Sequence, residues 1–163
     1  DVLEATGLSR AQLEELVRSN NKRRLQLSGE RVRACQGHSA GTPVTQLALE
    51  ASWELWTSDD RVWHGTSRAA LESIATIGLT AQQRTHVHLT ESKDSAVAKR
   101  KHVEVSLEID PRMLRSLGSA IHRAPNGVLL AREVLPACIV NLHPLTKATR
   151  RDEAELRRLF GLS

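Results

Sequence analysis

The sequence predicts an α+β fold whose sheet is mixed and largely antiparallel. Strand-like stretches outnumber helix-like ones, and few connections between them resemble the helical crossovers that parallel strands need. The strand-like stretches are RVWHGTS, RTHVHLT, HVEVSLEID, GSAIHRA, GVLLA and ACIVNLH. A length of 163 residues, with 40% hydrophobic and 26% charged side chains, suits one ordinary globular domain or two small ones.

The N-terminal part begins with a helix-start signal. In LSRAQLEELVRSN, Ser9 can cap the helix and Gln12 can return the bond, which predicts a helix from about Arg10 to Ser19. The following stretch, NNKRRLQLSGERVRACQGHS, alternates apolar and polar residues on both sides of a Ser28-Gly29 turn and predicts a hairpin. A short helix followed by a hairpin is typical of the back half of a winged helix. The helix that would come before it has no counterpart in the sequence.

We expect a domain boundary within the connector 41–60, which contains Gly41 and Pro43. The predicted domains are therefore residues 1–45, a winged-helix lobe lacking its first helix, and residues 46–163.

The second domain also contains three helix signals. SRAALESIATIGL has apolar residues at helical spacing and ends at Gly78, and Pro111 is well placed to open a short helix at PRMLRSL. The C-terminal RRDEAELRRLFGLS predicts a charged, peripheral helix with Leu156, Leu159 and Phe160 on one stripe.

The stretch RTHVHL, residues 84–89, suggests a site. In a strand, alternate side chains share a face, which would put Arg84, His86 and His88 on one face and Thr85, Val87 and Leu89 on the other. A metal site is disfavoured, because the His-x-His pair has no third ligand at a familiar zinc spacing and neither cysteine belongs to a CxxC. A solvated edge strand and an anion-binding face both stay open on these residues alone.

Composition narrows the class of partner. The net charge of +4 suggests an anionic partner, and three Trp, one Phe and no Tyr leave little material for stacking nucleic-acid bases. The sequence has no run of about 18 apolar residues and no signal-peptide pattern, so we expect no membrane association. Two cysteines argue against a disulfide scaffold and favour a cytoplasmic location.

Four stretches in order carry a resemblance: RVRACQGHS, WHGTS with the following GL, RTHVHLT, and APNGVLL with the following LP. Together they resemble the KptA/Tpt1 family of RNA 2′-phosphotransferases over roughly the whole chain after residue 8. The resemblance implies a winged-helix lobe followed by an ADP-ribosyltransferase-like lobe that binds NAD⁺ as co-substrate. We expect no metal cofactor, and a monomer whose partner is 2′-phosphorylated RNA.

The reaction implied by the resemblance has two steps. An internal RNA 2′-phosphate, of the kind left at tRNA splice junctions, attacks C1″ of the nicotinamide ribose and expels nicotinamide. The neighbouring ribose hydroxyl then attacks phosphorus, giving RNA with a 2′-OH and ADP-ribose 1″,2″-cyclic phosphate. Such chemistry depends on positioning and on cationic stabilisation more than on a protein nucleophile.

The resemblance also assigns residues. The family's Arg-His-Arg-Arg set has its third member at Arg33 and its fourth at Arg84, which we predict to be catalytic. Predicted NAD⁺-binding residues are His64, Gly65, Thr66, His86, His88, Asn126 and Gly127, and predicted RNA-phosphate-binding residues are Arg31, Gln36, His38 and Ser39. Without the resemblance, Arg31 and Arg33 would be interpreted as a solvated hairpin face, and Asn126-Gly127 as an ordinary turn.

Two departures from the family pattern stand out. The adjacent Arg-His pair, expected in an early helix of LxKxLRH type, has no counterpart in the sequence given, which leaves its catalytic competence open. Cys35 stands where the family usually has Asn, and Trp63 where it has Tyr. Two other functions stay open: an ADP-ribosyltransferase that caps phosphorylated ends of nucleic acid, and a non-catalytic winged-helix module that binds nucleic acid.

Overall fold

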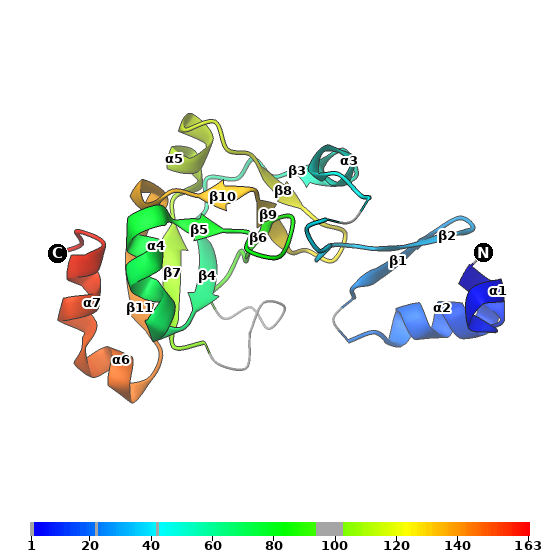
Figure 1. Cartoon of the computed structure of the whole chain (residues 1–163), viewed down its shortest axis with the longest axis horizontal. Coiled ribbons are helices and arrows are strands. Elements are labelled where there is room, and N and C mark those ends of the chain that lie inside the picture. Colours follow the sequence, from blue (N-terminus) through cyan, green and yellow to red (C-terminus); the bar gives the residue numbers. More distant parts are fainter. Residues whose placement is uncertain (1, 22, 42, 94–102) are drawn as a thin grey trace.

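The computed structural model describes residues 2–21, 23–41, 43–93 and 103–163, and has an α+β architecture (Figure 1). The predicted strand HVEVSLEID begins at His102, which lies outside the described residues. The helices are α1 (Val2–Thr6), α2 (Arg10–Ser19), α3 (Gln46–Glu50), α4 (Leu71–Ile77), α5 (Pro111–Ser116), α6 (Lys147–Arg151) and α7 (Glu153–Leu159), with 3₁₀ turns η1 (Arg68–Ala70) and η3 (Pro136–Cys138). The strands are β1 (Leu25–Ser28), β2 (Arg31–Ala34), β3 (Glu54–Leu55), β4 (Val62–Thr66), β5 (Leu79–Thr80), β6 (Val87–Leu89), β7 (Val105–Ile109), β8 (Ile121–Arg123), β9 (Leu129–Ala131), β10 (Glu133–Val134) and β11 (Ile139–Pro144).

The N-terminal elements extend away from the rest of the molecule (Figure 1). Helix α2 has the predicted bounds and the predicted capping box, in which Ser9 and Gln12 satisfy each other's backbone N–H groups. The predicted hairpin is confirmed as the antiparallel pair β1–β2, with Gly29 at φ +58° in its turn. The short α1 was not predicted.

The strands of the main body form two larger antiparallel sheets, in the orders β11-β7-β4 and β3-β8-β9-β6. Trp63 on β4 and Thr90, just after β6, exchange two backbone hydrogen bonds of 2.9 Å, which connect the two sheets. Every strand pair in the described part of the chain is antiparallel. The predicted α+β class and the mainly antiparallel pairing are confirmed, but the described strands show no parallel pair, so the sheet is not the mixed one that was predicted. The winged-helix and ADP-ribosyltransferase-like assignments and the boundary after residue 45 stay predictions.

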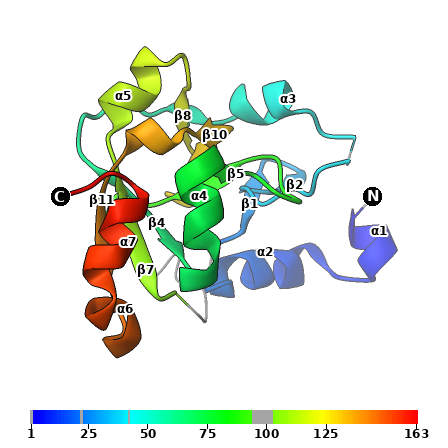
Figure 2. The same ribbon diagram turned by 60° about the vertical axis from the view of Figure 1, so that its left-hand side comes forward.

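The main core lies between these sheets and the helices, and includes the fully buried Val62, Leu71 and Leu107. Figure 2 shows α4 and α7 side by side, and these two helices are in contact. The predicted stop of α4 at Gly78 is confirmed. A Cβ at residue 78, where φ is +84°, would come within 2.2 Å of the Val134 carbonyl oxygen, so only glycine fits.

Two sequence predictions were wrong in detail. The connector 41–60 contains α3 and β3, because Thr45 caps the helix and Leu49 packs in a second apolar cluster with Trp53, Ala124, Val128 and Leu130. The C-terminal helix is divided at Asp152 into α6 and α7; of the predicted stripe, Leu156 is buried and Leu159 is 39% exposed. Among the described residues, no helix is both long and apolar enough to cross a bilayer.

Candidate active site

A cavity of about 610 Å³ opens where the two sheets meet. Its walls are the end of β4, one side of α4, and the segment from Gly78 to His88. This size is in the range of cofactor and small-molecule sites. Of the predicted site residues, the cavity wall includes His64, Thr66, Arg84, His86 and His88.

The predicted strand RTHVHL is correct for only half of its length. Strand β6 covers only Val87–Leu89. Arg84 makes an isolated bridge to Ser39, and Thr85 and His86, which connect Arg84 to β6, are in bends. His86 is only 2% exposed and turns into the protein. Arg84, His86 and His88 therefore do not form one exposed face.

The loop QGHS of the N-terminal part lies alongside this segment. The backbone N–H of Ala40 donates to the Gln83 carbonyl at 2.9 Å, and that of Thr85 donates to the His38 carbonyl at 3.1 Å. Gly37 has φ +86°, and a Cβ there would lie 3.9 Å from Arg84 Nη1. These contacts bring the loop predicted to bind RNA phosphate against the segment that carries Arg84.

Arg84, His88 and Gln36 converge at one edge of the cavity. The Gln36 side-chain oxygen lies 2.7 Å from His88 Nε2, so this ring nitrogen donates. Arg84 Nη1 lies 3.4 Å from His88 Nδ1 and 3.3 Å from Nε2. Because Nε2 donates to Gln36, the neutral ring offers Nδ1 as the acceptor for the guanidinium.

His64 is held next to this group. Its Nδ1 lies 2.9 Å from the His88 carbonyl oxygen, and since a carbonyl only accepts, Nδ1 carries the proton. In the neutral ring Nε2 is then the acceptor nitrogen. The side chain of a β4 residue is thus orientated by the backbone of β6.

The guanidinium of Arg84 has no carboxylate partner among the residues that the structure describes. Most arginines of the body do, as Arg132 and Arg123 illustrate with Glu50 and Glu91. An arginine near neutral acceptors can still give its charge and its fork of donors to an anion. Within the described ranges, no three His, Cys, Asp or Glu residues gather at metal-binding distance.

Residues outside the cavity wall hold the segment next to Arg84 in place, and the sequence alone did not indicate these contacts. Gln46 Nε2 donates to the Thr85 carbonyl at 2.8 Å, and Glu50, one turn later on α3, lies 3.0 Å from His86 Nε2. Arg132 forms a two-pronged pair with Glu50 at 2.7 Å and 2.7 Å. We call Gln46, Glu50, His86 and Arg132 the α3 brace.

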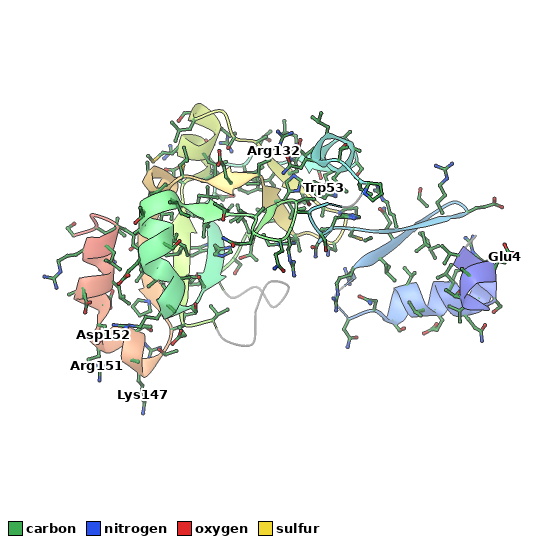
Figure 3. The ribbon with its side chains drawn as sticks, viewed as in Figure 1. Glu4, Trp53, Arg132, Lys147, Arg151 and Asp152 are labelled. Atoms are coloured by element: carbon green, nitrogen blue, oxygen red, sulfur yellow. The ribbon has the colours of Figure 1, made fainter. Side chains whose placement is uncertain are left out.

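The charge state of the brace follows from these contacts. The hydrogen bonds from Arg132, and secondarily from His86, lower the pKa of Glu50 to about 2 against the opposing effect of its burial, so the carboxylate is ionised near neutral pH. The rings of Trp53 and His86 pack in a T-shaped arrangement, with centroids 4.9 Å apart and an interplanar angle of 75°. Figure 3 shows Trp53 and Arg132 close to α3.

Other predicted site residues lie elsewhere. Arg33, Asn126 and Gly127 line a separate hollow of about 560 Å³, and Arg31 lines a third between α1, α2 and the hairpin. The structure therefore does not bring Arg33 into the cavity of Arg84, nor Asn126 and Gly127 to His64. Their predicted roles in catalysis and NAD⁺ binding stay predictions.

Cys35 and Gly65 have structural explanations. Burial raises the pKa of the Cys35 thiol, opposed in part by Arg33, so the thiol is protonated and a poor nucleophile. A Cβ at residue 65 would come within 2.8 Å of Val103 Cγ1. Glycine at this position is therefore needed for packing against Val103, whatever it does for a ligand.

Comparison with known families decides what this chain is. A family model described as RNA 2′-phosphotransferase, Tpt1 / KptA family, matches residues 1–133. The chain belongs to this family. The predicted recognition is confirmed, and with it the prediction that the protein is an enzyme of the transferase class, a 2′-phosphotransferase that acts on RNA.

Curated relatives in the RNA 2′-phosphotransferase family agree with this result. The chain is 38% identical over 132 residues to a probable RNA 2′-phosphotransferase of Pseudomonas paraeruginosa, covering 78% of this chain and 69% of the relative. It is 40% identical over 132 residues to one from Pseudomonas syringae pv. tomato, covering 78% and 67%. It is 37% identical over 131 residues to one from Acaryochloris marina, covering 78% and 68%.

The matched region of the 2′-phosphotransferase family contains the whole Arg84 cavity and the α3 brace. It ends at Glu133, so β11, α6 and α7 follow it. No short motif signals the brace, because Gln46, Glu50 and Arg132 act through contacts between distant parts of the chain.

Proposed function

We propose that this protein removes an internal 2′-phosphate from RNA with NAD⁺ as co-substrate, through a 2′-phospho-ADP-ribosylated RNA intermediate. The products are RNA with a 2′-OH, ADP-ribose 1″,2″-cyclic phosphate and nicotinamide. The observation that carries the proposal is the Arg84 guanidinium, which has no carboxylate partner among the described residues and contacts His88, itself bonded to Gln36, at the edge of a cofactor-sized cavity. Family membership supports the phosphate-removal step. The volume of the cavity supports the binding of a dinucleotide co-substrate such as NAD⁺.

Each residue near the cavity has a chemical task in this proposal. Arg84 supplies a planar cation with a fork of donors for the phosphate oxygens. His88, whose Nε2 proton is fixed by Gln36, holds Arg84 in place through its ring. His64, with its Nδ1 proton fixed by the His88 carbonyl, offers Nε2 to a ribose hydroxyl of the dinucleotide.

The two steps balance without a further reactant. In the first, an oxygen of the 2′-phosphate forms a bond to C1″ while the bond from C1″ to the nicotinamide nitrogen breaks. In the second, the 2″-hydroxyl forms a bond to phosphorus, the bond from phosphorus to the RNA 2′-oxygen breaks, and the proton of the hydroxyl ends on the RNA. Arg84 stabilises the negative charge that develops on the phosphate in the second step.

The reaction itself is the test. The protein is incubated with NAD⁺ and an RNA that carries one internal 2′-phosphate, and the nicotinamide, the cyclic phosphate and the 2′-OH RNA are quantified. RNA without the 2′-phosphate is the control, and it should yield no nicotinamide. An absence of nicotinamide with the phosphorylated RNA would overturn the NAD⁺-dependent proposal.

The same experiment separates a second function. ADP-ribosylated RNA that accumulates without cyclic phosphate would mean that the enzyme stops after the first step. An RNA with only a terminal phosphate then shows whether the protein caps nucleic-acid ends. We favour the complete reaction, because the matched family is one of 2′-phosphotransferases.

A further inference from the structure

The hollow that contains Arg33 is separate from the active-site cavity and has a cationic lining. Three arginines from different parts of the chain line it: Arg23 before β1, Arg33 on β2, and Arg123 at the end of β8. Of the described residues around it, Glu54 is the one acid. Three guanidinium groups, with Glu54 in the lining and Glu91 paired to Arg123, leave a net positive surface that favours a polyanion.

The donors in this hollow are incompletely used. Within the described residues, Arg23 and Arg33 have no carboxylate partner, and Arg33 Nε donates to the neutral Gln26 oxygen at 2.9 Å. Arg123 is orientated by Glu91 through Nη2 at 2.8 Å, yet its buried Nε has no hydrogen-bond partner there. The same holds for Asn126 Nδ2. Buried donors normally have partners, so Arg123 and Asn126 keep unused hydrogen-bonding capacity beside the hollow.

The lining indicates which part of a nucleic acid it recognises. No aromatic side chain is among the described residues of the hollow, so it offers no platform for stacking bases. Arginine forks and an amide suit phosphate and sugar oxygens, which fix the position of a strand without reading its sequence. Gly127, at φ +82°, has open space on its Cβ side, where a strand can approach the backbone closely.

The hollow is close to the active site along the chain. Arg33 lines the hollow, and Gln36, three residues later, bonds to His88 beside Arg84. Three residues of chain span at most about 10 Å, and the bends at residues 35 and 36 shorten this distance, so Arg33 and Gln36 lie within the reach of neighbouring nucleotides. A strand that presents its 2′-phosphate to Arg84 can therefore lay its adjoining backbone in the hollow.

We infer that the hollow of Arg23, Arg33 and Arg123 binds the sugar-phosphate backbone of the single-stranded RNA that flanks the reacting 2′-phosphate. This inference rests on the proposed function for the identity of the strand. It assigns Arg23 and Arg123 to substrate binding and gives Asn126 a place next to RNA rather than next to nicotinamide.

The test measures RNA binding without NAD⁺. The probe is a labelled single-stranded RNA of about ten nucleotides, made with and without one internal 2′-phosphate. Arg23→Gln and Arg123→Gln should each weaken binding of both RNAs by about fivefold at moderate salt, because each loses a charged phosphate contact. Each should also lower the slope of log K against log salt by about 0.7.

Arg158→Gln is the matched control. It removes the same charge from the exposed side of α7, at the end of the molecule opposite the hairpin (Figure 1). Equal effects of all three variants would overturn the inference, because they would reflect net charge alone. In turnover assays, Arg23→Gln and Arg123→Gln should raise the KM for the 2′-phosphorylated RNA by a larger factor than they lower kcat.

Two further readouts keep the test decisive. Arg23 lies in an exposed turn, so Arg23→Gln still decides the question if thermal unfolding shows that Arg123→Gln destabilises the fold. Failure of the proposed function is detected separately. Nicotinamide release by the unaltered protein tests the reaction, whereas RNA affinity tests the hollow and needs no NAD⁺.

Discussion

At the scale of single residues, Arg84 is distinguished by what surrounds it. Its guanidinium touches the ring of His88 and lies near the backbone of the 36–40 loop. These neighbours orientate the guanidinium, and no carboxylate of the described residues neutralises its charge. This makes Arg84 the cation best placed to bind the transferred phosphate.

Replacement of Arg84 should therefore affect the rate more than the fold. We expect Arg84→Ala to lower kcat by about 100-fold or more, which is typical when one donor to a developing anion is removed. Arg84→Lys should recover only part of this loss, because an ammonium cannot form a two-pronged contact. Steady-state kinetics with 2′-phosphorylated RNA measure both variants, with Arg158→Ala as the control. Near-normal turnover by Arg84→Ala would show that its side chain is only solvated surface.

Substitutions of His64 can separate the structural role of its Nδ1 from the proposed NAD⁺-binding role of its Nε2. In His64→Asn the amide can still donate to the His88 carbonyl, which Nδ1 does at 2.9 Å, but the Nε2 acceptor is gone. We expect NAD⁺ affinity to fall about tenfold, equivalent to about 1.4 kcal/mol, with an unchanged melting temperature. His64→Ala should lose both contacts and also lower the melting temperature. Calorimetric titration that finds full NAD⁺ affinity in both variants would remove His64 from the site.

At the scale of elements, α3 connects the position of the active-site segment to residues far along the chain. Gln46 and Glu50 lie one turn apart and hold consecutive residues, Thr85 through its carbonyl and His86 through its ring. Arg132, just after β9, completes the brace by pairing with Glu50. A change in the brace should therefore move Arg84 without touching any substrate.

The ionisation of Glu50 gives this brace a pH dependence. Its pKa is about 2 in the folded protein against an ordinary 4.5, so its contribution to stability is complete above about pH 4.5 and is lost as the pH falls toward 2. The contribution is at most about 3 kcal/mol. We expect Glu50→Gln to be less stable than the unaltered protein near pH 7, with a difference that shrinks on acidification.

Denaturant unfolding of both proteins from pH 7 to pH 3 measures this difference. A constant difference across that range would contradict the assigned role of the carboxylate charge. Glu72→Gln, on the exposed side of α4, is a matched control that should show little difference at any pH. Glu50→Gln should also lower kcat for RNA at pH 7 more than Glu72→Gln does, because it loosens the segment that carries Arg84.

The sequence predicted those elements whose signals are local. The capping box of Ser9 and Gln12 and the positive-φ cap at Gly78, whose N–H donates to the Ile74 carbonyl, act within one turn of helix, and both were found. Helix α3 was missed because its five residues are stabilised by packing of Leu49 against Val128 and Leu130. Such long-range contacts leave no periodic pattern.

The same limit explains what was predicted of the site. The alternation in RTHVHL correctly indicated a strand at Val87–Leu89, but His86 is turned inward by Glu50, which is 36 residues away. Family resemblance assigned Arg33 and Arg84 to one phosphate site, yet the hollow that each arginine lines depends on the path between hairpin and sheet. The residues could be named from the sequence, whereas their grouping required the fold.

At the scale of the whole molecule, the N-terminal hairpin is attached to the body through a few hydrogen bonds. Two are backbone bonds between the 38–40 loop and residues 83–85. A third runs from the indole Nε1 of Trp53 to the Cys35 carbonyl at 2.9 Å and is buried. Because Arg33 and Gln36 lie on either side of Cys35, we expect this bond to fix the position of the Arg33 hollow relative to the Arg84 cavity.

Trp53→Phe tests this connection, because phenylalanine keeps an aromatic ring over His86 but cannot donate to Cys35. An unpaired buried carbonyl costs about 1–3 kcal/mol, and this cost should appear locally as faster amide exchange in β1 and β2, with β7 unchanged. Turnover of 2′-phosphorylated RNA should fall more than NAD⁺ affinity, since the hairpin loosens while the cavity walls at His64 and Thr66 stay in place.

Trp56→Phe is the matched control, because Trp56 belongs to the main core and its truncation should destabilise the body without selectively freeing the hairpin. Equal exchange in β1 and β2 for the two variants, or a parallel loss of NAD⁺ affinity in Trp53→Phe, would show that the indole bond does not align the hairpin with the active site.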